Sequence, residues 1–236
     1  GEEYAFTFLI EKINNVEITP AQLALDPCTA GCTVTDVNTG KVRALVTYPS
    51  YNNNMLSGSV DAVYFSQLNE DLSLPLYNNA TQVVKAPGST FKPITAIAGL
   101  EEGVITVGEN IYGRGIFTDI TDRPPTCWIY NQYGGHHGNE NVSTAIRDSC
   151  NYYFYETGYR LSLNGMVYNE KKGIAAIQKY ASLFGLDDTV GIEIPESEPQ
   201  VADEYPITAA IGQSNNNYTT AQIARYITAV ANKGTG

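Results

Sequence analysis

The spacing of apolar and polar residues predicts most of the secondary structure of this chain. Two β-branched runs within residues 32–51 flank Asn38-Thr39-Gly40, which predicts an antiparallel hairpin that turns at the glycine. Residues 52–84 lack a clear period and are rich in Asn and Ser, so we expect a long loop with short helices there. Apolar residues at helical spacing predict helices over residues 3–16, 89–102, 171–186 and 219–234, and two more on either side of Ser149.

These elements add up to one mixed α/β domain of the α+β type over residues 1–236, with residues 1–22 as an N-terminal helix and linker. The chain has 236 residues, 43% of them hydrophobic, which is enough to bury a core. Only 17% are charged and no low-complexity segment interrupts the chain, which argues against disorder.

The charge balance narrows the choice of partners. A net charge of -11 argues against a nucleic-acid partner, because neutralising phosphates requires clustered Lys and Arg. No apolar stretch reaches the length of a membrane span, and no signal peptide opens the chain. Because the chain begins abruptly inside polar sequence, we expect it to be part of a longer protein.

The cysteines and histidines do not form a metal-binding pattern in the sequence. Cys28 and Cys32 are spaced C-x3-C without a second pair, and four cysteines are too few and too scattered for a disulfide framework. The adjacent His136 and His137 point in different directions and cannot chelate as i and i+4 neighbours on a helix do. We therefore predict no metal and no cofactor, with structural roles for both histidines.

The most informative short motif is Ser89-x-x-Lys92 at the start of a predicted helix. Positions i and i+3 share one helix face, so the serine hydroxyl and the lysine amine can meet. A lysine whose pKa is lowered can take the serine proton, and the positive end of the helix favours a developing oxyanion. On these residues alone an ordinary N-cap is the better explanation of Ser89, because serine is favoured at that position and S-x-x-K recurs often by chance.

The surrounding sequence decides between these two interpretations. PGSTFKPITAIAGLEEG, from Pro87 to Gly103, resembles the nucleophile segment of the penicillin-binding proteins, whose motifs are S-x-x-K, S-D-N and K-T-G. TVTDVNTGKVRALVTYPSYNNN is similar to the opening hairpin of that family, and PLYNNATQVVKAPGSTFK to the approach to its nucleophile in the class B branch. The resemblance covers about residues 33–235 in matching order, and it implies the penicillin-binding/serine β-lactamase-like transpeptidase fold, with helices around an antiparallel sheet.

By the same resemblance, Ser149-Cys150-Asn151 is the second motif. A second hydroxyl is needed to relay the proton, for which Ser149 is the candidate, and Asn151 has a carbonyl and an amide suited to orienting Lys92 and the substrate. Taken alone, the tripeptide is better explained as a turn that ends a helix. Cys150 fills the variable central position, where we expect it to point into packing rather than to react.

The third motif, K-T-G, is absent from these residues. The nearest string, from Asn232 to Gly236, follows a predicted helix instead of lying on a strand. In the family this motif lies on an edge strand further along and binds the substrate carboxylate. We therefore expect the fold to be incomplete at the C-terminus, and this part alone to be weakly active or inactive.

The resemblance implies a serine-type peptidoglycan D,D-transpeptidase. Its substrates would be peptidoglycan stem peptides, its inhibitors β-lactams and its possible partners cell-wall synthesis proteins. It would lie on the extracytoplasmic face of the bacterial membrane, with an anchor outside this chain. The alternatives are a β-lactam sensor domain or a catalytically degenerate scaffold. A β-lactamase is disfavoured because no Glu-x-x-Leu-Asn string follows Ser149.

Overall fold

The computed structural model describes residues 2–18, 28–120 and 123–234. Within these ranges, most predicted elements are confirmed within a few residues of their expected ends. The predicted linker up to residue 22 lies partly outside the described residues. The helices are α1 (Glu2–Asn14), α2 (Asn53–Leu56), α3 (Ala62–Glu70), α4 (Lys92–Glu101), α5 (Trp128–Tyr133), α6 (Val142–Arg147), α7 (Asn151–Leu161), α8 (Glu170–Leu183), α9 (Pro206–Ala209) and α10 (Thr220–Ala231).

The strands of the described residues form antiparallel pairs rather than one sheet. β1 (Ala30–Thr35) pairs with β2 (Val42–Tyr48), with Cys32 opposite Val46, as the hairpin pattern predicts. Two short pairs join β3 (Ile111–Gly113) to β4 (Gly138–Glu140) and β5 (Leu163–Asn164) to β6 (Val167–Tyr168). The expectation of helices around antiparallel strands is confirmed, although each sheet has two strands.

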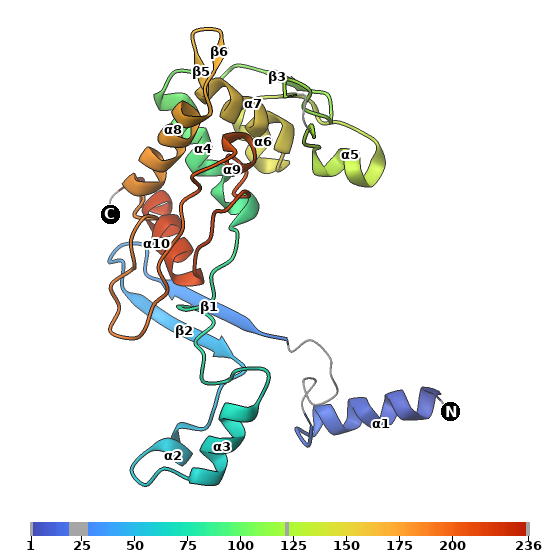
Figure 1. Ribbon diagram of the computed structural model, residues 1–236, viewed down its shortest axis with the longest axis vertical. Helices are drawn as coiled ribbons and strands as arrows, with labels where there is room; N and C mark the ends of the chain where they lie inside the picture. Colours follow the sequence, from blue (N-terminus) through green and yellow to red (C-terminus); the bar gives the residue numbers. More distant parts are fainter. Residues whose placement is uncertain (1, 19–27, 121–122, 235–236) are drawn as a thin grey trace.

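Most of the helices form one body, which the β1–β2 hairpin adjoins, and two segments lie outside it. In Figure 1, α4, α7, α8 and α9 lie together, and α10 lies between them and the β1–β2 hairpin. The α2–α3 segment projects from the far side of the hairpin, and α1 lies apart from the body (Figure 1). Among the described helices, none combines the length and the apolar character that crossing a bilayer requires.

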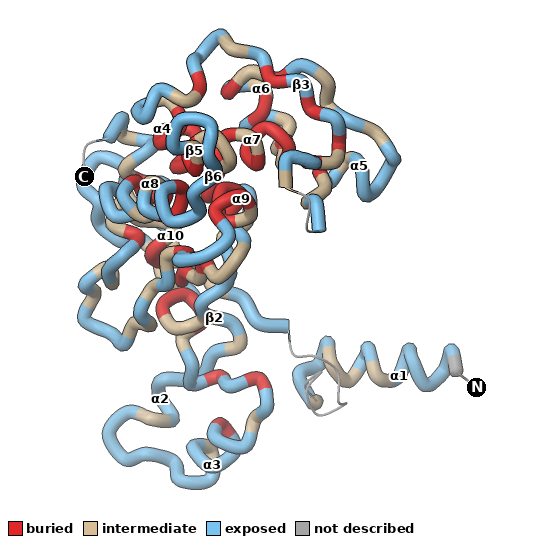
Figure 2. Tube along the Cα trace, turned by 45° about the horizontal axis from the view of Figure 1, so that its top comes forward, coloured by how far each residue is buried: buried red, intermediate tan, exposed pale blue. Residues whose placement is uncertain are grey.

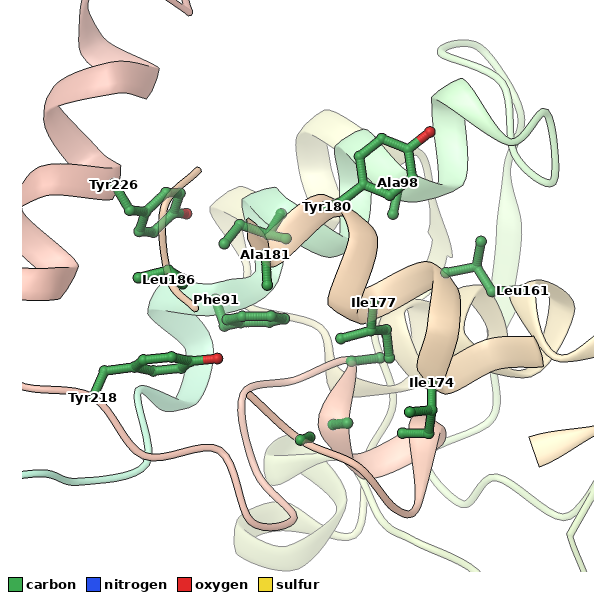
Figure 3. Close-up of a cluster of buried hydrophobic side chains, with 14 residues drawn as sticks. Phe91, Ala98, Leu161, Ile174, Ile177, Tyr180, Ala181, Leu186, Tyr218 and Tyr226 are labelled. Carbon is green, nitrogen blue, oxygen red and sulfur yellow. The ribbon is translucent and has the colours of Figure 1, made fainter. Parts of the chain in front are cut away.

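α4 is the central helix: most of its residues are buried (Figure 2), and it contributes side chains to two buried clusters. Phe91, Ile94 and Ala98 belong to a cluster shared with α8 and α10, in which the Phe91 and Tyr218 rings stack at a centroid distance of 6.3 Å (Figure 3). Ala96, on α4, belongs to a second cluster that is built largely from α6 and α7. Burial on both sides fixes the position of α4, and with it the position of the S-x-x-K motif at its start.

Candidate active site

Ser89 lies in a tight turn just before α4, not in the α-helix as expected. Residues Gly88–Phe91 form a short 3-10 helix, η2, and the α-helix begins at Lys92. The Gly88 N–H donates to the Gly212 carbonyl at 3.0 Å, and both glycines have positive φ, 55° and 70°. A Cβ on Gly212 would lie 2.2 Å from the Gly88 carbonyl oxygen, so this close approach requires glycine. The contact holds the turn in place and leaves Ser89 exposed.

Lys92 is the buried cation of the site. Its residue is 1% exposed, and Nζ donates to the Ser149 carbonyl oxygen at 2.8 Å, to Ser149 Oγ at 2.9 Å and to Asn151 Oδ1 at 2.6 Å. Burial lowers the pKa of Lys92 from 10.5 to about 8, and the nearby Cys127 and Cys150 side chains, whose thiolate forms would favour the charged amine, oppose this effect. Nζ also lies 5.6 Å from the centre of the Phe154 ring. A lysine in this setting can serve as a base near neutral pH.

Ser149 joins the two halves of the site. It lies between α6 and α7, where two helical patterns were expected to break, and its Oγ donates to Ser89 Oγ at 2.9 Å. In the described residues, the link between the lysine and the nucleophile therefore runs through Ser149 Oγ, and no direct Lys92–Ser89 hydrogen bond is formed. The structure thus brings together all four residues singled out in the sequence, Ser89, Lys92, Ser149 and Asn151. Their roles stay predictions.

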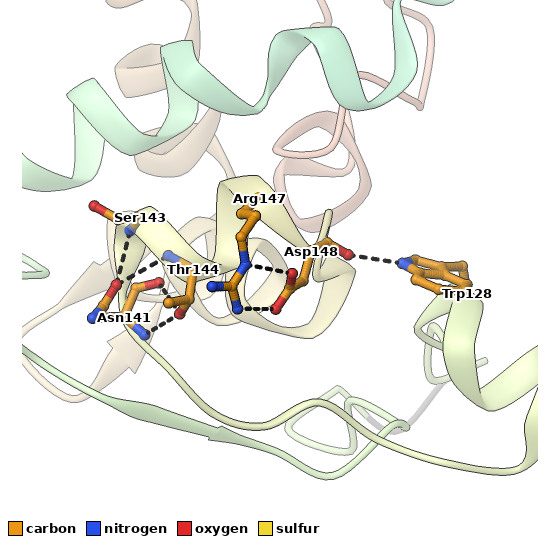
Figure 4. A network of polar contacts seen from close by, with 6 residues as sticks. All are labelled: Trp128, Asn141, Ser143, Thr144, Arg147 and Asp148. Atoms are coloured by element: carbon orange, nitrogen blue, oxygen red, sulfur yellow. Dashed lines mark hydrogen bonds and ion pairs between the residues drawn. The ribbon is translucent and has the colours of Figure 1, made fainter.

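The two ends of α6 set the position of this junction. Asn141 caps the start of the helix by accepting from the Ser143 and Thr144 N–H groups, both at 3.0 Å (Figure 4). At its other end Arg147 pairs with Asp148 at 2.7 Å, and this exposed ion pair contributes little stability. The position of α6 is therefore fixed mainly by the cap at its start and by the packing of its buried residues, Val142 and Ala145.

A second cluster of reactive side chains lies beside this junction, and the sequence analysis missed it. Cys127, His137 and Cys150 offer ligand atoms that all lie within 4.8 Å of one another, with Cys127 Sγ 3.6 Å from His137 Nδ1. A hydrogen bond from the Cys150 thiol lowers the pKa of Cys127 to about 5, and the same contact raises the pKa of Cys150. Two sulfurs and an imidazole are ligands suited to Zn²⁺.

The expectations for these residues have separate outcomes. Cys150 is buried, as expected, whereas Cys28 and Cys32 are exposed and free. The prediction of a chain without a metal stays a prediction. The pattern that could have revealed the cluster is a cysteine before a His-Gly pair, followed by the cysteine of the second motif. It was not recognised because the folded loop before β4, and not the spacing, brings His137 to the two thiols.

A serine hydrogen-bonded through a second hydroxyl to a buried lysine is the arrangement expected of an active-serine acyl-transfer site. Comparisons with known proteins agree with this class. The sequence profile of the penicillin binding protein transpeptidase domain matches residues 30–236. The chain therefore belongs to the penicillin-binding protein transpeptidase family.

Individual relatives share this domain. The Haemophilus influenzae peptidoglycan D,D-transpeptidase MrdA is 29% identical over an alignment of 217 residues that covers 85% of this chain and 31% of the relative. The imipenem acyl-enzyme of Mycobacterium tuberculosis penicillin-binding protein A superposes with a TM-score of 0.74 at 27% identity, over 88% of this chain and 47% of that one. A chain of a peptidoglycan synthase complex that coordinates polymerization and crosslinking superposes with a TM-score of 0.74 at 28% identity. The match covers 85% of this chain and 34% of that one. The chain thus spans about a third of the curated relative's length.

Proposed function

We propose that the protein containing this chain is a peptidoglycan D,D-transpeptidase. The single observation that carries the proposal is the continuous hydrogen-bonded path from Lys92 Nζ through Ser149 Oγ to Ser89 Oγ. Such a path can move a proton away from the nucleophile as it attacks. The acyl-enzyme of the mycobacterial relative supports covalent chemistry at a site of this fold.

The residues perform the first half-reaction as follows. Ser89 Oγ attacks the carbonyl of the penultimate D-alanine of a stem peptide, and its proton passes through Ser149 to neutral Lys92. The Ser89 backbone N–H is one donor to the oxyanion. The C–N bond breaks, the departing D-alanine amine takes the proton back through Ser149, and Ser89 carries an ester. Asn151 holds Lys92 by its side-chain oxygen, and its amide group is a donor suited to the substrate backbone.

An amine from a neighbouring stem peptide then resolves the ester in the second half-reaction, forming the cross-link and releasing Ser89. A β-lactam acylates the same oxygen, and the ring-opened product stays attached. Further partners would be cell-wall synthesis proteins, for which the similar chain in the synthase complex gives support. We place the domain on the extracytoplasmic face of the membrane, where stem peptides are cross-linked, with its anchor outside these residues.

The test is covalent labelling of the full-length protein by a fluorescent penicillin, with the adduct mapped by mass spectrometry. We expect one label on Ser89 and none on the Ser89→Ala variant. Labelling at another residue, or labelling that survives Ser89→Ala, overturns the proposal. Release of D-alanine from a D-Ala-D-Ala peptide with formation of a cross-linked product then separates a transpeptidase from a sensor, which is acylated but does not turn over.

A further inference from the structure

Trp128 contacts the catalytic junction from outside. It is the first residue of α5, and its indole N–H donates to the Ser149 carbonyl oxygen at 3.1 Å and to the Asp148 carbonyl oxygen at 3.3 Å. Figure 4 shows the ring facing the end of α6. The ring also packs edge-to-face on His137, with centroids 5.4 Å apart.

The backbone that Trp128 contacts is held in a disfavoured conformation. Ser149 has φ 51°, in the left-handed region that residues with a Cβ avoid. It follows the end of α6, where the Cys150 N–H donates to the Ala145 carbonyl at 2.9 Å. Glycine is the usual residue at such a helix end, but glycine would remove the hydroxyl that the site uses. Ser149 therefore needs outside contacts to hold its backbone.

Two donors supply those contacts by sharing one oxygen. The Ser149 carbonyl accepts from Lys92 Nζ at 2.8 Å and from Trp128 Nε1 at 3.1 Å. Relaxation of the Ser149 backbone would move this carbonyl away from both donors. The same movement would displace its hydroxyl from between Lys92 Nζ and Ser89 Oγ, to each of which it is bonded at 2.9 Å.

We propose that Trp128 is a positioning residue for acylation, whose indole N–H holds Ser149 in the left-handed conformation that places its hydroxyl in the proton path. This inference rests on the proposed function, because it assigns a role within the same site. Trp128 forms no hydrogen bond to Ser89 or Lys92 among the described contacts, so it acts through Ser149. The simpler alternative is that Trp128 serves only to pack its ring on His137. That role would not require the hydrogen bond from its indole N–H to the Ser149 carbonyl.

Two substitutions in the full-length protein separate these roles. Trp128→Phe keeps an aromatic ring against His137 and removes the donor. Trp128→His loses the larger ring but keeps an N–H at the same ring position, two bonds from the atom that joins the ring to Cβ. A donor role predicts that histidine rescues what phenylalanine loses, and a packing role predicts the reverse.

The measurement is the acylation of Ser89 by a fluorescent penicillin over a range of concentrations. We expect Trp128→Phe to lower the limiting first-order rate roughly tenfold, the effect of losing one hydrogen bond, with little change in the half-saturating concentration. Trp128→His should recover most of that rate. A wild-type rate in Trp128→Phe, or a loss in both variants that follows their melting temperatures, overturns the inference.

A second measurement does not depend on catalysis. Amide hydrogen exchange of the peptide across the junction of α6 and α7 should be faster in Trp128→Phe and close to wild type in Trp128→His, because the contact stabilises the turn. Equal exchange in wild type and Trp128→Phe contradicts the positioning role. Failure of Ser89 labelling in the wild-type protein would instead refute the proposed function, and the exchange result would still decide the role of Trp128.

Discussion

Acylation should depend on pH through Lys92. Burial lowers the pKa of this lysine from 10.5 to about 8, which corresponds to ~3 kcal/mol against the charged form. At pH 7, about one molecule in ten then carries a neutral Lys92, against roughly one in three thousand for an ordinary lysine. Burial thus raises the population of the base by a few hundredfold. Because the neutral amine is the active form, the acylation rate should rise with pH and level off above about pH 8.

The assay is the rate of Ser89 labelling by a fluorescent penicillin in the full-length protein, between about pH 6 and pH 10, the range in which such a lysine titrates. Lys92→Ala should be acylated too slowly to show the rise of the rate with pH. Lys171→Ala, which removes an exposed lysine of α8, should reproduce the wild-type profile. A rate independent of pH, or a midpoint near 10.5, would refute the argument that burial prepares Lys92 as the base.

The remaining predictions address the backbone and the thiols. Ser149→Gly should relieve the strain of the left-handed backbone and raise the free energy of unfolding, measured by chemical denaturation, by ~1 kcal/mol. The same variant should nearly lose acylation by penicillin, and acylation at the wild-type rate would contradict the role of Ser149 in proton transfer. Gly212→Ala should lower the melting temperature and slow acylation, because its Cβ would meet the Gly88 carbonyl; a wild-type melting curve would show that the turn can shift. Elemental analysis of purified protein tests the prediction of no metal, which expects no zinc. Zinc that Cys150→Ser reduces and that Cys32→Ser, at an exposed position, leaves unchanged would overturn that prediction and assign the metal to the cluster of Cys127, His137 and Cys150.

The sequence was informative where chemistry depends on local spacing. Ser89 and Lys92 are three positions apart, and the two polar residues of Ser149-Cys150-Asn151 are two positions apart. Each motif can therefore be recognised without knowing the fold. The helices and the hairpin were predictable for the same reason. The site residues that were missed depend on a loop that the fold lays against the junction of α6 and α7. No local pattern states that Trp128 reaches the Ser149 carbonyl.

The hydrogen bonds of the candidate active site connect two separately packed parts of the core. Phe91, next to Lys92, is fully buried in the cluster shared with α8 and α10, whereas Cys150, next to Ser149, is buried in the cluster of α6 and α7. The Ser149 hydroxyl lies 2.9 Å from partners on the other side of this division, so a small shift of α4 against α7 would break the path. Phe154 of α7 adds a second link, because it packs in the core and its ring faces Lys92 Nζ. The packing that stabilises the domain therefore also excludes water from the lysine and lowers its pKa.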